Sequence, residues 1–166
     1  MRRTLTVGVC LAAVLCAQEA VRAAVGYAAS ALPGVPLLAG GKSFGGRMTS
    51  GAQANVPLPG VGGLIFLGFP LHPPGKPDVV RGAHLDQVAI PMIFLQGSRD
   101  DFARPDLISA VTSRLGARAT LEVVEGADHS FNVRKSSGRT AAEVLEGLGV
   151  MIAAWVNSLV PPLGRS

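Results

Sequence analysis

The chain has 166 residues, a length typical of one domain, with 48% apolar and only 16% charged residues. This composition excludes a disordered chain, and two cysteines are too few for a disulfide framework or a cysteine-rich zinc site. The formal charge is +4, but the arginines are scattered, so neither nucleic-acid nor membrane binding is indicated.

Residues 1–34 allow two interpretations. Arg2 and Arg3 precede an apolar run and several small residues, which is the outline of an export signal. A stripe with helical spacing runs through the same small residues and favours a soluble helix in a cytoplasmic protein, although residues 1–16 fit either interpretation. The stripe consists of Ala17, Ala20, Val21, Ala24, Ala28, Ala31 and Leu32, with Gln18, Glu19 and Arg22 on the other sides.

Beyond residue 34, strand-like and helix-like segments alternate, which indicates an α/β domain with a mostly parallel sheet. Thr140 and Glu143 form a capping box at the start of the last helix, whose apolar face should pack on the sheet. We expect strands at 35–39, 63–69, 91–97 and 119–124, helices at 43–54 and 105–115, and a loop at 70–91 with one helical turn near 80–85. The predicted organisation is a helix at 1–34, one domain at 35–160 and a tail at 161–166.

A motif of the form G-x-S-x-G lies between the first predicted strand and the following helix, at residues 41–45. There Ser43 would project from a sharp turn, and glycines at 41 and 45 would avoid clashes between strand and helix. The N–H of Phe44, at the helix N-terminus, would stabilise an oxyanion. An incidental serine in a glycine-rich turn is one alternative. A phosphate-binding loop is another, but Pro36 stands where that motif needs glycine.

An aspartate and a histidine follow the next strand ends. Asp100 comes just after the third predicted strand and His129 just after the fourth, which gives the order serine, aspartate, histidine of α/β-hydrolase triads. Because parallel strands end at one edge of a sheet, the three side chains should meet. Ser43 would attack an acyl carbon, His129 would move the proton and Asp100 would orient the imidazole.

This arrangement predicts a serine hydrolase that acts on a small ester, thioester or related acyl substrate. The mechanism requires no cofactor and no metal. Asp101 and Asp128 are alternative acids that we interpret as solvated loop charges. We interpret His72 and His84 as loop histidines, and Trp155 as part of the core.

Four stretches of the chain, in order, resemble one α/β-hydrolase-like family: AGGKSFGGRMTS, GLIFLGFPLHPPGKP, PMIFLQGSRDDFA and GADHSFNV. This family is a mostly uncharacterised bacterial group related to dienelactone hydrolases. The chain also resembles the hydrolase-like domain of testis-expressed and chromatin-complex-subunit proteins of animals. The resemblance covers residues 17–159 and implies an α/β-hydrolase fold, with Ser43, Asp100 and His129 at the triad positions. It implies no particular substrate.

The front of the chain departs from this family. Several strands normally precede the nucleophile strand, and the loop after the third supplies a second oxyanion N–H. Residues 1–34 match at best one helix, so the sequence predicts that these strands and half of the oxyanion hole are absent. Losing one such donor costs about 100- to 1000-fold in turnover. The exposed sheet edge would favour a homo-oligomer. The alternative function is therefore a non-catalytic, truncated module that binds a partner or itself.

Overall fold

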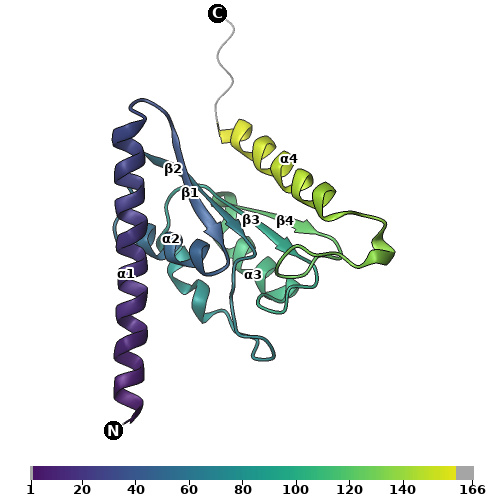
Figure 1. Cartoon of the computed structure of the whole chain (residues 1–166), viewed down its shortest axis with the longest axis horizontal. Coiled ribbons are helices and arrows are strands. Elements are labelled where there is room, and N and C mark those ends of the chain that lie inside the picture. Colours follow the sequence, from purple (N-terminus) through teal and green to yellow (C-terminus); the bar gives the residue numbers. More distant parts are fainter. Residues whose placement is uncertain (1, 160–166) are drawn as a thin grey trace, which may run out of the picture.

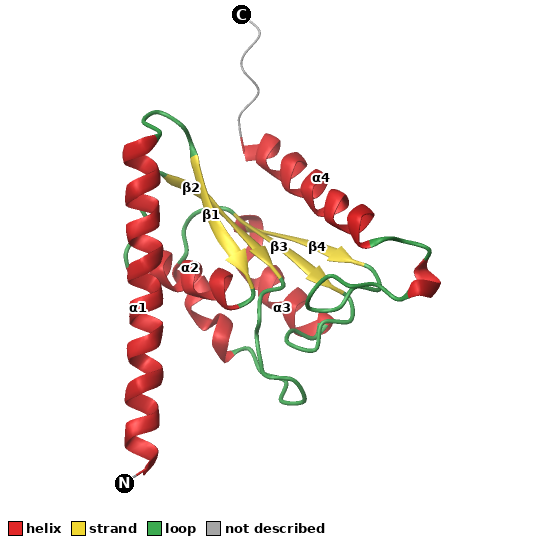
Figure 2. Ribbon diagram, viewed as in Figure 1, coloured by secondary structure: helices red, strands yellow, loops and turns green. Residues whose placement is uncertain are grey.

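In the part of the chain that the structure describes, four parallel strands form one sheet in the order β1–β2–β3–β4. This structure is a computed structural model that describes residues 2–159, with side chains from residue 12 onward. The helices and strands, shown in Figures 1 and 2, are α1 (Arg2–Ala31), β1 (Leu37–Lys42), α2 (Phe44–Asn55), β2 (Val61–Leu67), η1 (Val80–Gln87), β3 (Met92–Gly97), α3 (Pro105–Leu115), β4 (Ala119–Val124) and α4 (Ala141–Leu159).

The third strand is the most deeply buried element. All six residues of β3 are buried, as a strand covered on both faces requires. The predicted strand at 91–97 is thereby confirmed. The first predicted strand is present, but β1 begins two residues later than the predicted 35–39 and extends to Lys42. The prediction that it is buried is wrong, because its residues alternate between half-buried and exposed. As an edge strand, β1 is packed mainly by α2 and α1 on one face.

Helices cover both faces of the sheet and enclose two apolar cores. Met92 and Phe94 of β3 point into the core beneath α1, α2 and α3, whereas Ile93 and Leu95 point into the core beneath α4. Figure 1 shows α4 alone on its side of the sheet. The alternation follows from the period of two in a strand. The predicted α/β sheet with flanking helices is confirmed.

The N-terminal helix packs through a face that overlaps the predicted stripe only in part, because Val21 packs against the core whereas Ala24 and Ala31 are exposed. Leu32, expected in the stripe, is 52% exposed, whereas Gln18 is only 9% exposed. The Gln18 amide oxygen accepts a hydrogen bond of 3.0 Å from the Asn55 side chain, and the Arg22 guanidinium donates to the carbonyl oxygens of Ala52 and Val56. These carbonyls lie at the C-terminal end of α2. The Ala52 oxygen already accepts from the Val56 N–H at 3.2 Å, but a carbonyl oxygen can accept a second hydrogen bond, so both carbonyls can bind polar side chains on α1.

The last helix begins at the predicted capping box. The Glu143 carboxylate accepts from the Thr140 N–H at 2.6 Å, and the Glu143 N–H donates to the Thr140 hydroxyl at 3.2 Å. Length and composition would allow α4 to cross a bilayer, but core helices pass the same test. Val144, Leu148 and Trp155 of α4 are buried against the sheet, which confirms Trp155 as a core residue.

Candidate active site

Ser43 occupies the sharp turn between β1 and α2. Its backbone has φ 51° and ψ −118°, a positive φ that non-glycine residues rarely adopt. The Ser43 N–H donates to the Leu67 carbonyl at 2.9 Å, so the turn is tied to the end of β2. This is the strained strand-to-helix geometry that lifts a serine hydroxyl above a sheet.

The glycines around Ser43 do not all have the predicted role. A Cβ on Gly41 would lie 3.1 Å from the Gly45 carbonyl carbon, which supports the predicted close approach. Gly45 has open space at its Cβ position, so the prediction for that residue is wrong. Gly46 takes that role, because its Cβ would lie 2.7 Å from the Gly41 carbonyl oxygen. The glycine requirement falls on Gly46 because its Cα faces the backbone of β1 at close range.

The three predicted site residues form one chain of hydrogen bonds. The Ser43 hydroxyl lies 2.8 Å from Nε2 of His129, and Nδ1 of His129 lies 2.7 Å from Oδ2 of Asp100. Because an ionised carboxylate only accepts, Nδ1 carries the proton and Nε2 is left to accept from the serine. The Asp100 side chain is completely buried, and that of His129 is 18% exposed.

Two residues that sequence reasoning missed hold the Asp100 carboxylate. The Gln96 amide donates to Oδ2 at 2.5 Å, and the Phe102 N–H donates to Oδ1 at 2.8 Å. Gln96 also accepts from the Phe69 N–H at 2.9 Å, so both the oxygen and the nitrogen of its buried amide have a partner. The available signal was a glutamine in an otherwise apolar strand, four residues before Asp100.

The alternative acids lie elsewhere, as the sequence predicted. Asp101 is exposed. Asp128 accepts from the N–H groups of Ser130 and Asn132, at 2.8 and 2.9 Å, and so shapes the loop that carries the histidine. Burial raises the pKa of Asp128, but these backbone hydrogen bonds outweigh it and leave that pKa below its ordinary value.

The imidazole of His129 has two close neighbours, Phe102 and Gly68. The Phe102 ring lies over it with centroids 4.4 Å apart and a tilt of 35°. A Cβ on Gly68 would lie 3.3 Å from the imidazole, so the backbone there also approaches the ring closely. Packing of this kind restricts the ring to the orientation that its hydrogen bonds select.

His72 is satisfied by backbone, as the sequence predicted. Its Nδ1 lies 2.9 Å from the Pro73 carbonyl oxygen, and its Nε2 accepts from the Arg104 N–H at 3.1 Å. His72 is 2% exposed, and it holds loop backbone together rather than lining the hollow beside Ser43.

A second serine–histidine contact lies behind the site. Nε2 of His84, in η1, is 2.7 Å from the hydroxyl of Ser50 in α2, and Ser50 is fully buried. The same hydroxyl donates to the Arg47 carbonyl at 3.0 Å, so it joins η1 to α2. Burial, and then the positive charge of Arg47, lower the pKa of His84.

The lowered pKa of His84 predicts acid sensitivity. The pKa of His84 is lower in the folded protein than its ordinary value of 6.5, so this histidine binds a proton more readily in the unfolded chain. The free energy of unfolding should therefore fall as the pH drops below 6.5. Replacing His84 by glutamine should flatten this fall. The check is urea unfolding of both proteins from about pH 8 to about pH 5. Parallel curves for the two proteins would contradict the prediction.

A small hollow opens beside Ser43. Its volume is about 180 Å³, and its lining comprises Ser43, Phe44, Arg47, Pro70, Arg81 and Phe102. Phe44 is the first residue of α2, where helical geometry leaves an N–H without a partner inside the helix. Among the residues that the structure describes, no cluster of three or more histidine, cysteine or acidic side chains could hold a metal ion.

A parallel sheet that carries a serine at a strand-to-helix turn, with an acid and a histidine at later strand ends, defines an α/β hydrolase fold. The chain belongs to an alpha/beta hydrolase domain family, whose pattern matches residues 12–157. The predicted fold is thus confirmed. The predicted relation to dienelactone hydrolases and to the testis-expressed and chromatin-complex-subunit proteins stays a prediction.

Solved structures with the same fold include three bacterial proteins. An alpha-beta serine hydrolase homologue from Coxiella burnetii is 20% identical (TM-score 0.62), and 82% of this chain matches 57% of that one. An a/b serine hydrolase without lid from Xanthomonas campestris is 21% identical (TM-score 0.61), with 83% and 56% covered. An esterase domain from Rhodothermus marinus is 14% identical (TM-score 0.62), with 83% and 67% covered. The chain therefore spans 56% to 67% of these proteins.

Proposed function

We propose that this protein is a serine hydrolase that cleaves an ester, thioester or related acyl bond. The observation that carries the proposal is the hydrogen-bonded chain from Ser43 through His129 to the buried Asp100. Its support is chemical, because a serine becomes a nucleophile when a neighbouring base accepts its proton and a third group orients that base.

In the proposed reaction, Oγ of Ser43 forms a bond to the acyl carbon while Nε2 of His129 takes the hydroxyl proton. The carbonyl oxygen becomes an oxyanion, to which the Phe44 N–H donates. The intermediate then expels the alcohol or thiol, which receives the proton from His129. Water attacks the acyl-serine by the same route and releases the acid. Asp100 stays ionised and stabilises the charged imidazole throughout.

A fluorophosphonate probe tests this proposal. The probe should label the protein, because Oγ of Ser43 displaces fluoride from phosphorus once His129 accepts its proton. The Ser43→Ala variant should not be labelled. Ser50→Ala is the matched control, because Ser50 also contacts a histidine but its hydroxyl is buried. Intact-mass spectrometry counts the adduct. Labelling that survives in the Ser43→Ala variant would reject Ser43 as the nucleophile, and its loss in Ser50→Ala alone would point to Ser50 instead.

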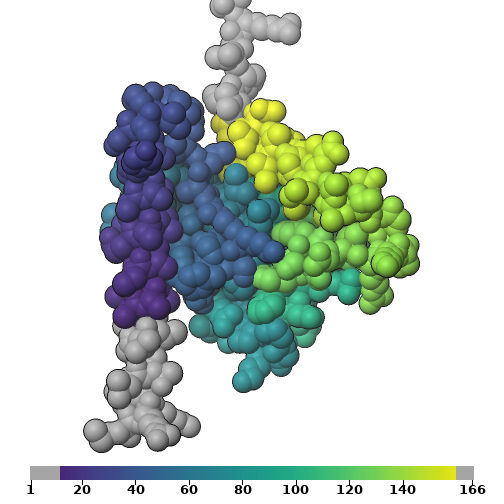
Figure 3. All heavy atoms as spheres, viewed as in Figure 1, coloured from purple at the N-terminus to yellow at the C-terminus, as the bar shows by residue number. Residues whose placement is uncertain are grey.

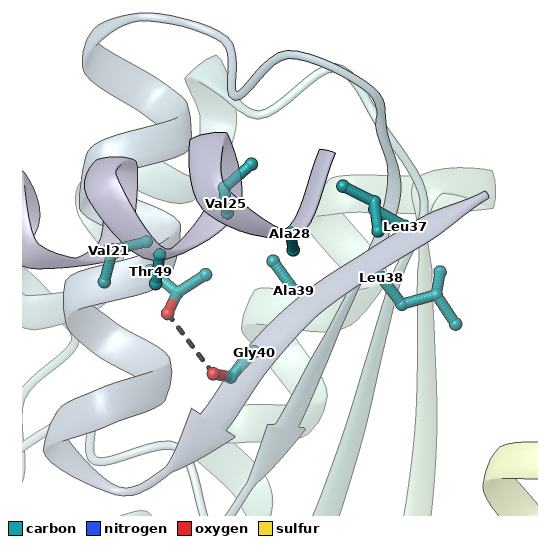
Figure 4. Close-up of a pocket in the computed structure, with 9 residues that line it drawn as sticks. Val21, Val25, Ala28, Leu37, Leu38, Ala39, Gly40 and Thr49 are labelled. Atoms are coloured by element: carbon teal, nitrogen blue, oxygen red, sulfur yellow. Dashed lines mark hydrogen bonds between the residues drawn. The ribbon is translucent and has the colours of Figure 1, made fainter. Parts of the chain in front are cut away.

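As a second candidate function, we propose self-association of two copies through the outer edge of β1. Within the described residues β1 has a strand neighbour on one side only. A groove of about 270 Å³ lies between this edge and α1, and Figure 4 shows its apolar walls from Val21, Val25, Leu37 and Ala39. The Thr49 hydroxyl lies 3.3 Å from the Gly40 carbonyl oxygen. Two identical edge strands can pair antiparallel about a two-fold axis.

Sedimentation velocity checks the association. The wild-type protein should sediment as a dimer, and Leu38→Lys should give a monomer, because a lysine on an edge strand opposes pairing. Leu38 is 38% exposed on β1. Val123→Lys is the matched control, because Val123 is 45% exposed on β4, at the opposite edge of the sheet. A monomeric wild-type protein, or an effect confined to Val123→Lys, would contradict this second proposal.

A further inference from the structure

The hollow beside the candidate nucleophile is lined by two arginines. Arg47 comes from α2, one turn after Ser43, and Arg81 comes from η1. The remaining wall is aromatic or apolar, from Phe44, Pro70 and Phe102, and no acidic side chain lines the hollow. Two positive charges thus adjoin the point at which a scissile bond would be placed.

The same arginines also line a second hollow. It has a volume of about 340 Å³ and lies between α1, α2 and η1, where Gln18, Met48 and His84 also line it. No acidic residue lines this hollow either. Arg47 and Arg81 therefore form the boundary between the two hollows.

Within the described side chains, the charge of Arg81 has no anionic partner. The half-buried Arg81 has no ion pair and no side-chain hydrogen bond to any residue whose side chain the structure describes. The guanidinium carbon of Arg47 lies 5.9 Å from the centre of the Phe44 ring, on the side of the Ser43 hollow. After burial, the positive charge of Arg47 is the second cause of the lowered pKa of His84.

We propose that the Ser43 site is selective for esters or thioesters whose acyl part ends in a carboxylate, which Arg81 binds with help from Arg47. This inference rests on the proposed function. A guanidinium matches a carboxylate with two parallel hydrogen bonds, and the match is strongest away from bulk water. The hollow of about 180 Å³ is small, so the carboxylate lies only a few bonds from the acyl carbon that Ser43 attacks.

Binding to the Ser43→Ala protein tests the selectivity without requiring turnover. Isothermal titration calorimetry compares monomethyl glutarate with methyl 5-methylhexanoate, in which an isopropyl group replaces the carboxylate at the same chain length. The anionic ester should bind about 10- to 100-fold more tightly, the range expected for hydrogen bonds to a charged group. Added sodium chloride should weaken the binding of the anionic ester only, because salt screens a contact between two charges.

Two further substitutions in the Ser43→Ala background locate the contact. Arg81→Gln should remove most of the preference for monomethyl glutarate, and Arg81→Lys should restore part of it, because lysine keeps the charge but not the planar pair of donors. Lys76→Gln is the matched control. It removes one positive charge from the same segment of chain, at an exposed residue that lines neither hollow. Equal affinity for the two esters, or equal losses in Arg81→Gln and Lys76→Gln, would overturn the inference.

Turnover by the protein with Ser43 intact separates this inference from the proposed function. If Arg81 binds the substrate carboxylate, Arg81→Gln should raise KM for monomethyl glutarate and leave methyl 5-methylhexanoate unchanged. If Arg81 instead stabilised the oxyanion, kcat would fall for both esters, which would overturn the inference. Failure to hydrolyse either ester, combined with selective binding by the Ser43→Ala protein, would count against the proposed function and still support the carboxylate site.

Discussion

Replacing Asp100 by asparagine should lower kcat/KM for ester hydrolysis by about 10⁴-fold. The asparagine amide would donate to Nδ1 of His129, which now donates to the carboxylate at 2.7 Å. The imidazole proton would then move to Nε2, the atom that must accept from Ser43. The loss is therefore one of tautomer rather than of packing. Initial rates with an activated ester measure the change, and near-ultraviolet circular dichroism confirms that the variant is folded.

Asp101→Asn is the matched control for this change. The two aspartates are adjacent in sequence, but Asp101 is exposed and makes no hydrogen bond to His129. Its substitution should change kcat/KM by no more than about twofold, because exposed single charges contribute little. If Asp101→Asn lost activity and Asp100→Asn did not, the assignment of the acid would be wrong.

Gly40→Ala should lower the free energy of unfolding by at least about 3 kcal/mol, through overpacking against backbone. A Cβ at this residue would lie 1.9 Å from the Ile65 carbonyl oxygen, and Gly40 pairs with Ile65 in the β1–β2 ladder. The clashing atom belongs to the backbone, so no rotamer change relieves it and the two strands must separate. Urea denaturation measures the loss.

Gly45→Ala is the control, because the sequence motif gives Gly45 the same apparent importance. Nothing lies within 4 Å of its Cβ position. Alanine in a helix is favoured over glycine by up to about 1 kcal/mol, so this variant should be as stable as the wild type or more stable. A large loss of stability in Gly45→Ala, with none in Gly40→Ala, would contradict the packing described for β1.

The sequence alone predicted most of the helices and strands and the three residues that meet at the site. Alternating apolar segments indicated an α/β sheet, and parallel strands must end at one edge. Asp100 and His129 were therefore expected beside Ser43 from their places after strands, without knowledge of any contact. The capping box was also predictable from the sequence, because Thr140 and Glu143 lie within one helical turn of each other.

Contacts between elements far apart in the chain were decided only by the tertiary structure. Which glycine is needed depends on how closely α2 approaches β1, and the structure assigns this role to Gly46 rather than Gly45. Gln18 and Arg22 turn inward because the C-terminal end of α2 offers them carbonyl oxygens and the Asn55 amide, which no periodicity reveals. Arg47 and Arg81 lie beside the same hollows because η1 packs on α2. Local patterns fix elements and strand ends, whereas packing between elements decides which polar side chains find partners.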